Sequence, residues 1–338
     1  MNRKQIVGPQ SPTDNSFTAK ARKLQSTWRA QNGLEMGIGP NKISVDRKTG
    51  LPTYYGNMIK DGEITGRNFY FPETFAYAKW RVDKKFKEET IDDYRLFNNL
   101  MSSMPMAFNL FHPLMMLHAQ NPVVVDKMMQ NAFPDFPIFK VKEIGLEFIP
   151  TPIEQYTNDK SAMDAFISFY DKKGSEHIIA IETKYTDSLG TNSASGIGVF
   201  EKQIQMLKDL DLFTEKCIQK LESKEIQLSQ IYRNFLLAEK YRQVQNLKNS
   251  YSIILAPEKH PSTDKEIISL KQFLKKEYKD LKLNKLSLEL FVKKLEENCP
   301  FEYMGWLDWF ENRYLNFGKL NETRTTNNPD IYLETHKI

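Results

Sequence analysis

The chain has 338 residues, of which 40% are hydrophobic and 12% are aromatic, a composition that is typical of a globular protein and excludes a disordered chain. Its 47 Lys and Arg residues against 43 Asp and Glu residues give a net charge of only +4, which does not by itself indicate a nucleic-acid-binding protein. Cys217 and Cys299 have no metal-site spacing and cannot build a disulfide framework, and no stretch has the pattern of a signal peptide or a membrane span, so we expect a cytoplasmic protein without membrane contact.

The first 66 residues are expected to form a basic, irregular arm, followed by a single domain over residues 67–338. The arm is rich in Gly, Pro, Asn and Ser, and we expect a short helix around residues 17–31 with extended or loop structure elsewhere. Within residues 1–48, nine basic residues stand against three acidic ones, a net charge near +6. Such a segment either faces the phosphates of a nucleic acid or is ordinary solvated surface, and the sequence leaves both interpretations open.

Three helices are expected next along the chain. The second spans residues 88–104, and the third spans residues 105–120, up to a break at Asn121-Pro122. The first has an apolar stripe at helical spacing, formed by Phe75, Ala78, Val82 and Phe86.

The middle of the chain changes to strand patterns. Residues 140–149 alternate between polar and apolar side chains, and residues 162–185 have the pattern of two strands joined by a glycine-containing turn. A loop with Gly190, Gly196 and Gly198 follows, which we interpret as a mobile segment beside the strand end. Further helices are then expected at 199–211 and 226–247, a strand at 251–257, Lys-rich amphipathic helices up to about 297, and an aromatic helix at 306–317.

The second strand of the pair ends in an unusual set of side chains. Its apolar residues occupy both faces, so we expect it inside a sheet that is covered on both sides. Glu182 and Lys184 come at its end and point to the same face. If the turn centres on the Lys-Lys pair, Asp164 of the first strand lies beside Ile181 or Glu182. The sequence therefore predicts Asp164, Glu182 and Lys184 together at one edge of the sheet.

These residue types suit metal-assisted hydrolysis of a phosphodiester. The carboxylates of Asp164 and Glu182 would repel each other, and Mg²⁺ would remove that repulsion while keeping several of its waters. The metal can polarise a phosphodiester oxygen and lower the pKa of a bound water, and Lys184 can orient that water and stabilise charge on the phosphate. We therefore predict all three as catalytic, with Mg²⁺ held by the two acids and Mn²⁺ as a substitute.

The Glu-x-Lys spacing alone is a weak signal, because it recurs at residues 222–224 and 277–279 in charged helical segments. Residues 182–184 differ in following an apolar strand and in having Asp164 across a turn. From the hairpin alone, a surface ion pair at a strand end remains the alternative interpretation.

The chain resembles the PD-(D/E)XK nuclease superfamily, whose core is a helix, three strands, a helix and a strand. Asp164, followed after a turn by Glu182-Thr-Lys184, matches the superfamily motif, although Met163 rather than Pro precedes the Asp. The resemblance implies a restriction-endonuclease-like α/β fold, with a central mixed sheet flanked by helices, helical additions at both ends, and a core over about residues 88–260. Within the superfamily, a group of predicted restriction-endonuclease-like proteins is similar to residues 98–114, 179–190 and 230–241.

The resemblance also implies roles for individual residues. In the superfamily, the acids that match Asp164 and Glu182 bind Mg²⁺, and the Lys that matches Lys184 assists the attacking water. Gln230 and Arg233 open the helix after the catalytic strand, where members often place a Gln or a basic residue near the phosphate, so they are candidate nucleic-acid contacts.

Some further polar and aromatic residues are candidates for the site. Glu147, on the strand before the hairpin, either adds a metal ligand or points outward to solvent. His112 and His118 are six residues apart, which is not the spacing of a helical metal pair, so we expect them in the core or on the surface. The aromatic residues of the last helix are expected to form core packing, as are those around Ser102.

The function predicted from these features is that of a Mg²⁺-dependent endonuclease that cuts DNA in a restriction or defence system. One alternative is a nucleic-acid-binding protein that keeps the fold without cutting. Another is a nuclease for RNA or branched DNA, because the same chemistry attacks a phosphodiester with either sugar. A homodimer and a monomer that nicks each strand in turn are equally consistent with one site per chain. The sequence does not show which bases are recognised.

Overall fold

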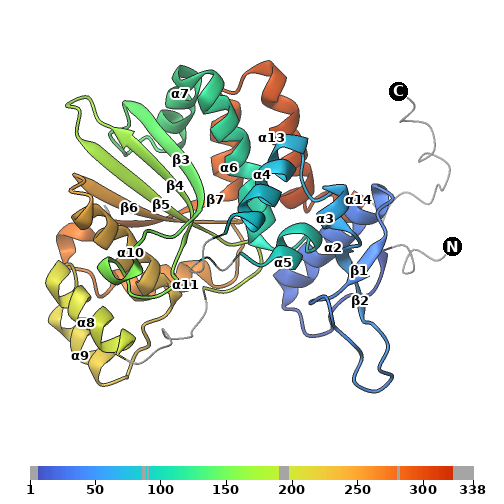
Figure 1. Cartoon of the computed structure of the whole chain (residues 1–338), viewed down its shortest axis with the longest axis horizontal. Coiled ribbons are helices and arrows are strands. Elements are labelled where there is room, and N and C mark those ends of the chain that lie inside the picture. The colour runs from blue at the N-terminus through green and yellow to red at the C-terminus, as the bar shows by residue number, and fades with distance from the viewer. Residues whose placement is uncertain (1–6, 86–88, 90, 190–197, 280–281, 323–338) are drawn as a thin grey trace.

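A computed structural model of the chain describes residues 7–85, 89, 91–189, 198–279 and 282–322. At its centre lies a five-stranded mixed sheet with the order β3-β4-β5-β6-β7 (Figure 1). The first three strands are antiparallel to one another, whereas β5, β6 and β7 are parallel. The strands are β3 (Lys140–Phe148), β4 (Met163–Tyr170), β5 (Glu176–Thr183), β6 (Asn249–Ala256) and β7 (Leu283–Ser287).

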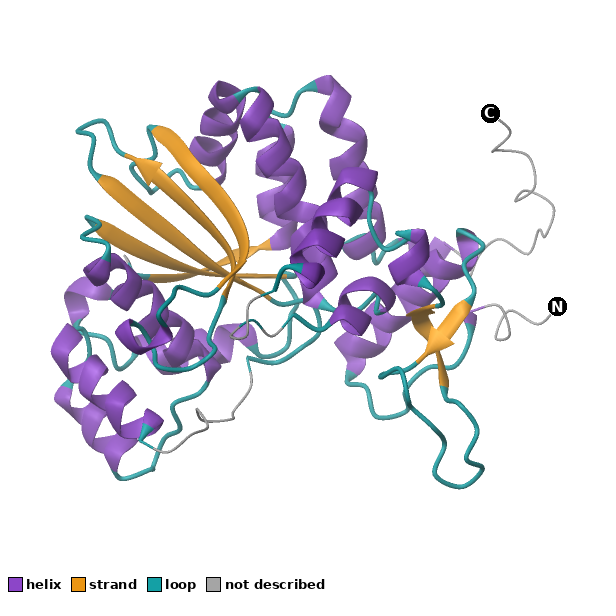
Figure 2. Ribbon diagram, in the orientation of Figure 1, coloured by secondary structure: helices purple, strands orange, loops and turns teal. Residues whose placement is uncertain are grey.

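Helices cover both faces of this sheet (Figure 2). Ile179 and Ile181 of β5 face a large apolar core, whereas Ile178 and Ala180 face a second cluster that includes Leu237. The alternation confirms that both faces of this strand are buried. The five-stranded mixed sheet flanked by helices confirms the expected α/β fold and is consistent with a restriction-endonuclease-like core. The first face is covered by α6 (Ser103–Gln120), α7 (Pro122–Ala132), α12 (Leu288–Glu296) and α13 (Phe301–Tyr314), and the second side carries α8 (Val199–Leu210), α9 (Glu215–Glu222), α10 (Gln230–Val244) and α11 (Thr263–Lys271).

The N-terminal residues are joined to the sheet by a buried polar network. The predicted helix is present as α2 (Ser16–Gln31), and the extended segments expected after it pair as the strands β1 (Met36–Ile38) and β2 (Tyr54–Ile59). Gln25 of α2 donates one hydrogen bond to the hydroxyl of Tyr185, at 3.1 Å, and another to the carbonyl of Arg313, at 2.8 Å. This ties α2 to the segment that follows β5 and to α13, while the division of the chain at residue 66 stays a prediction.

Four further helices of the described residues lie outside these two layers. No helix in the described part of the chain is long and apolar enough to cross a membrane. These helices are α3 (Gly62–Thr65), α4 (Pro72–Asp83), α5 (Asp93–Asn98) and α14 (Lys319–Glu322), with 3-10 turns at Ile153–Gln155 and Lys276–Tyr278.

The expected helix over residues 88–104 is wrong, because the chain is extended at Asn99 between α5 and α6. The side chain of Asn98 accepts a hydrogen bond from the backbone of Gly62, and that of Asn99 accepts one from Met101, so these amides compete with helical bonding. Ser102 then caps the first turn of α6 by accepting from Met104. The helix that packs on the sheet is therefore α6.

The break expected at Asn121-Pro122 is confirmed, because α6 ends at Gln120. Two elements beyond it were not expected. Pro122 is the first residue of a new helix, α7, a position where the missing proline N–H removes no helical bond. The Lys-rich helices expected up to residue 297 are interrupted by β7, which pairs with β6. The pairing of β7 with β6 therefore outweighs the helical pattern of the local sequence.

His112 and the aromatic residues of α13 take the structural roles expected of them. His112 is buried and bonded to the hydroxyl of Thr74 at 3.0 Å, and burial lowers the pKa of its ring to about 4. The indole of Trp306 donates to the carbonyl of Asn109 at 2.7 Å, and Phe310 is fully buried. Phe86, Gly190 and Gly196 lie outside the described residues.

Candidate active site at the end of strand β5

Three carboxylates lie side by side on three neighbouring strands. The pairing of Ala165 with Ile181 places the next residues, Asp164 and Glu182, opposite each other, which is one of the two registers predicted. On the other side of β4, the flanking pairs of β3 place Glu147 opposite Asp164. Facing residues of antiparallel strands share a face, so the sheet brings together acids that are distant in the sequence.

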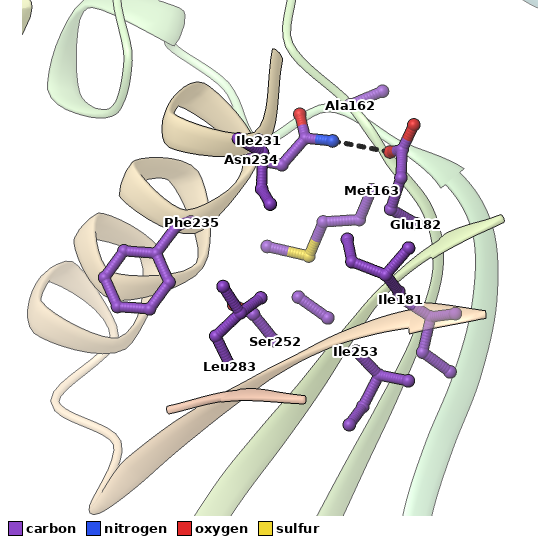
Figure 3. Close-up of a pocket in the computed structure, with 12 residues that line it drawn as sticks. Ala162, Met163, Ile181, Glu182, Ile231, Asn234, Phe235, Ser252, Ile253 and Leu283 are labelled. Atoms are coloured by element: carbon purple, nitrogen blue, oxygen red, sulfur yellow. Dashed lines mark hydrogen bonds between the residues drawn. The ribbon is translucent and has the colours of Figure 1, made fainter. Parts of the chain in front are cut away.

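Glu182 is held by three donors. The ammonium of Lys184 lies 2.7 Å from its Oε1, and the amide of Gln230 donates to the same oxygen at 2.9 Å. The amide of Asn234 donates to Oε2 at 2.6 Å (Figure 3). Even-numbered residues of β5 face α10, so the strand directs Glu182 and Lys184 toward the first turns of that helix.

The surroundings of Glu182 disfavour its ionised form. A small cavity of about 20 Å³ lies below the carboxylate and is lined by apolar side chains that include Met163, Ile231 and Phe235 (Figure 3). Burial over this floor and the nearby charge of Asp164 raise the pKa of Glu182 to about 7, against the opposing effects of Lys184 and Asn234.

Asp164 and Lys184 complete the group. Both the backbone N–H and the hydroxyl of Thr183 donate to Oδ2 of Asp164, at 2.8 and 2.9 Å. Burial nevertheless raises the pKa of Asp164, although Lys184 and these bonds oppose the shift. Burial alone would lower the pKa of Lys184, but Glu182 and Asp164 outweigh it and raise that pKa, so the ammonium stays charged. Lys184 also donates to the amide oxygen of Gln230 at 3.3 Å.

Glu147 is buried among charges of its own sign. Burial and the charge of Asp164 raise its pKa well above the usual range, and Arg81 opposes this only in part. Arg81 donates to the backbone carbonyl of Glu147 at 2.8 Å and pairs its charge with Glu89 at 2.7 Å. Glu147 has a φ of 47°, in the left-handed region, which is uncommon for a side chain other than Gly and is concentrated at functional sites. The outward, solvated placement considered for it is therefore wrong.

All six residues singled out from the sequence line one polar cleft of about 540 Å³. Arg233 lies on its α10 side, where it pairs with Asp159 at 3.4 Å, and Arg95 of α5 contributes a cation from the opposite side. The cleft is lined by Arg95, Ser103, Met104, Glu147, Asp159, Lys160, Ser161, Ala162, Asp164, Glu182, Lys184, Asp187, Ser188, Gln230, Arg233 and Asn234.

Asn234 and Arg95 were missed by the sequence interpretation. Asn234 follows Gln230 by four residues on a helix, so the two amides share a face, and this spacing was the available signal. Arg95 lies in the segment before α6, and nothing in its local pattern relates it to residues near 182.

The donor set fits a hard divalent cation that keeps water ligands. Three buried carboxylates share the cleft with one ammonium, that of Lys184. The pKa of each acid is raised in spite of this positive charge. Among the described residues, no group of three His, Cys, Asp or Glu side chains is close enough to hold a metal ion by itself. Hard divalent cations such as Mg²⁺ bind through one or two carboxylates together with waters and substrate phosphate.

The other two Glu-x-Lys copies have no such surroundings. Glu222 is exposed and pairs with Lys208 at 2.6 Å, and Glu277 is exposed in a 3-10 turn. Neither lines the cleft.

The sequence matches a known protein family over most of its length. A family profile described as the PD-(D/E)XK nuclease superfamily matches residues 12–316. No curated protein and no solved structure matches the chain.

Proposed function

Because the chain belongs to the PD-(D/E)XK nuclease superfamily, we propose that it is a Mg²⁺-dependent endonuclease that hydrolyses DNA phosphodiester bonds as part of a restriction or other defence system. The observation that carries the proposal is the buried pair of Glu182 and Lys184 beside Asp164, at a polar cleft. A nuclease fold acts on nucleic acid, and this pair supplies the residue types that phosphodiester hydrolysis needs.

Each residue has a defined part in the proposed reaction. Asp164 and Glu182 would hold Mg²⁺, with Glu147 as a further carboxylate on the same side of the cleft. When bound, the metal supplies Lewis acidity that polarises a phosphodiester oxygen and lowers the pKa of a coordinated water. Lys184 orients the attacking water and stabilises the charge that grows on the phosphate.

The residues on α10 hold the reacting groups in place. The amides of Gln230 and Asn234 fix both oxygens of Glu182, and Gln230 also accepts from Lys184. Arg233 at the same end of α10, which pairs with Asp159, and Arg95 across the cleft, which lies 3.5 Å from Asp187, would attract the phosphates of the substrate.

The preference for DNA rests on the similarity of three stretches of the chain to restriction-endonuclease-like proteins. The catalytic residues act on the phosphodiester, so they would cut RNA by the same chemistry. An RNA or branched-DNA nuclease, and a binding protein that does not cut, are the competing functions.

The test is cleavage of supercoiled plasmid by purified protein with Mg²⁺, with Mn²⁺ and with EDTA. We expect cleavage with either metal, none with EDTA, and cleavage reduced about 10³-fold with Glu182→Gln or Lys184→Ala. The exposed copy of the motif provides a matched control, since Glu222→Gln with Lys224→Ala removes the same charges and should leave cleavage unchanged. Equal cleavage by Lys184→Ala and the control pair would contradict the assignment.

A panel of duplex, single-stranded, branched and RNA substrates separates the competing functions. Faster cleavage of RNA or branched DNA than of duplex DNA would replace the proposed substrate. Salt-sensitive binding without turnover in any divalent metal would favour the binding protein.

A further inference from the structure

Residues 40–53 form a projecting loop between β1 and β2, called the hairpin arm below (Figure 1). Its shape is set by its own hydrogen bonds. The backbone N–H of Asp46 donates to the carbonyl of Leu51 at 2.8 Å, and that of Thr53 donates to Ser44 at 3.0 Å. Oδ1 of Asp46 accepts from the backbone of Lys48 at 3.0 Å and of Thr49 at 2.9 Å, which closes the tip. The arm is therefore an ordered projection.

The hairpin arm exposes large apolar side chains. Ile43 is 85% exposed, Leu51 is 65% exposed and Val45 is 53% exposed. Single exposed apolar residues are ordinary on a protein surface, but three within nine residues of one ordered projection indicate a contact surface.

The same arm carries an excess of positive charge. Lys42, Arg47 and Lys48 are exposed, and none of them forms an ion pair with the described residues. The one acidic side chain, Asp46, is directed at the N–H groups of the tip. A surface with both cations and apolar groups suits a polyanion that also offers stacked bases.

The root of the arm adjoins the rim of the cleft. The hydroxyl of Tyr94 donates to the carbonyl of Ile38 at 2.7 Å, at the end of β1, and the next residue of α5 is Arg95, which lines the cleft. Figure 1 shows α5 between the strand ends of the central sheet and the β1–β2 pair. A nucleic acid that extends from the cleft past Arg95 would therefore pass the root of the arm.

We propose that the hairpin arm binds a groove of duplex DNA beyond the cleaved phosphate, with Lys42, Arg47 and Lys48 on the phosphates and Ile43 and Leu51 against the base pairs. This rests on the proposed function only in that duplex DNA occupies the cleft. Of the two interpretations of the basic N-terminal segment, it adopts the phosphate-facing one for the arm, which presents its cations outward, whereas Arg22 and Arg29 are engaged inside the protein. The arm thus lengthens the contact between the protein and duplex DNA. It should not contribute to binding of a single strand, because a single strand has no groove for the arm to enter.

The test measures binding by the full chain in EDTA, where no cleavage occurs, to a short duplex that fills only the cleft, to a longer duplex and to a single strand. For Arg47→Ala with Lys48→Ala, we expect roughly tenfold weaker binding to the longer duplex and a slope of log affinity against log salt that is lower by about 2. Ile43→Ser with Leu51→Ser should weaken binding to the same duplex with the salt slope unchanged. Binding of the short duplex and the single strand should not change in either variant.

A matched control is Lys127→Ala with Lys140→Ala, which removes two exposed cations on α7 and at the start of β3. If the arm variants bind the longer duplex as the wild type does, or lose no more affinity than the control, the proposal is overturned. A serine variant that dissociates an oligomer while its affinity for duplex is unchanged would identify the arm as a protein contact and would equally overturn it.

Failure of the proposed function has a different result. Wild-type protein that binds duplex through the arm but cuts nothing in any metal would remove the nuclease assignment and keep the arm. If the wild-type protein cuts plasmid and the arm variants bind the longer duplex as the wild type does, the nuclease assignment stands and the arm proposal is overturned.

Discussion

Two buried Lys–Glu pairs lie near opposite ends of helix α10, and they differ in what surrounds them. At the N-terminal end, Lys184 meets Glu182 at 2.7 Å. Toward the C-terminal end, Lys282 meets Glu239 of the helix itself at 3.0 Å. All four side chains are buried, so burial and pairing alone do not distinguish the two.

The pair at the C-terminal end is balanced by its neighbours. Glu239 also accepts from the hydroxyl of Ser250 and from Arg242 at 2.9 Å, so two cations and a hydroxyl converge on one carboxylate. It does not line the polar cleft. Such a cluster joins α10 to β6 and to the residue before β7, and its role is structural.

The pair at the N-terminal end is surrounded by more carboxylates than cations. One ammonium serves Glu182 and Asp164, with Glu147 beside them, and the pKa of every one of these acids is raised. Carboxylates whose pKa values are raised by burial and like charge, and which lie in an open cleft, are candidates for a functional role. An excess of like charge at an open cleft, rather than a buried ion pair, therefore distinguishes the candidate site from the structural cluster.

The largest expected effect separates the two pairs by activity. Glu182→Gln, Lys184→Ala and Asp164→Asn should each reduce plasmid cleavage about 10³-fold, because each removes a group that acts on the metal, the water or the developing charge. Glu239→Gln should leave the rate per folded molecule unchanged. The measurement is the initial rate with Mg²⁺, normalised to the folded fraction, and equal losses from Glu182→Gln and Glu239→Gln would abolish the distinction.

The second expected effect separates them by stability. Glu239→Gln leaves the buried ammonium of Lys282 without its carboxylate and should lower the free energy of unfolding by about 3 kcal/mol or more. Urea denaturation at pH 7 in EDTA measures this. Lys220→Gln breaks the exposed pair with Glu225 and is the control, with an expected change of about 0.5 kcal/mol. A loss in Glu239→Gln no larger than the control would mean that the cluster does not stabilise the fold.

A third effect concerns pH. Folded Glu182 ionises at about pH 7, whereas an unperturbed Glu ionises at 4.5, so the unfolded chain releases its proton first and stability falls as pH rises through this window. Glu182→Gln removes that dependence. Its stability relative to wild type in EDTA should therefore increase by about 3 kcal/mol between pH 4.5 and pH 7.5. A relative stability that is flat over this range would contradict the raised pKa.

The strand pattern predicted the central part of the site well. Strand patterns of apolar residues located the strands from β3 to β6, and the turn between β4 and β5 narrowed the register to two choices, one of which places Asp164 opposite Glu182. Both signals are local, so a single sequence carries them. The resemblance to the nuclease superfamily added the fold class.

What the sequence did not predict depends on tertiary contacts. β7 has five residues and is a strand because β6 offers it a parallel edge. Glu147 was a candidate ligand whose direction the sequence left open, and it reaches the other acids through the pairing of β3 with β4. Arg95 lies across the cleft because α5 packs beside α6. Asn234 has no apolar pattern to mark it, and its part is defined by the carboxylate that it meets.

Asn234 gives the smallest predicted effect and the sharpest test of the amide contacts. Asn234→Ala removes the donor to Oε2 of Glu182 without changing any charge, so the carboxylate is held on one side by Lys184 and Gln230 and loses its orientation. We expect the Mg²⁺ concentration for half-maximal cleavage to rise about tenfold, with a smaller change in the rate at saturating metal, as for other residues that orient a metal ligand.

Two further substitutions on α10 sharpen the test of this contact. Asn234→Asp has nearly the same shape as wild type but adds a fourth acid, so it should raise the pKa of Glu182 further and lower cleavage more at pH 6 than at pH 8. Gln243, on the last turn of the same helix, offers a control whose replacement by Ala should change neither the metal requirement nor the rate. If Asn234→Ala lowered the rate at saturating Mg²⁺ while leaving the metal requirement as in wild type, Asn234 would act on the substrate instead of on Glu182.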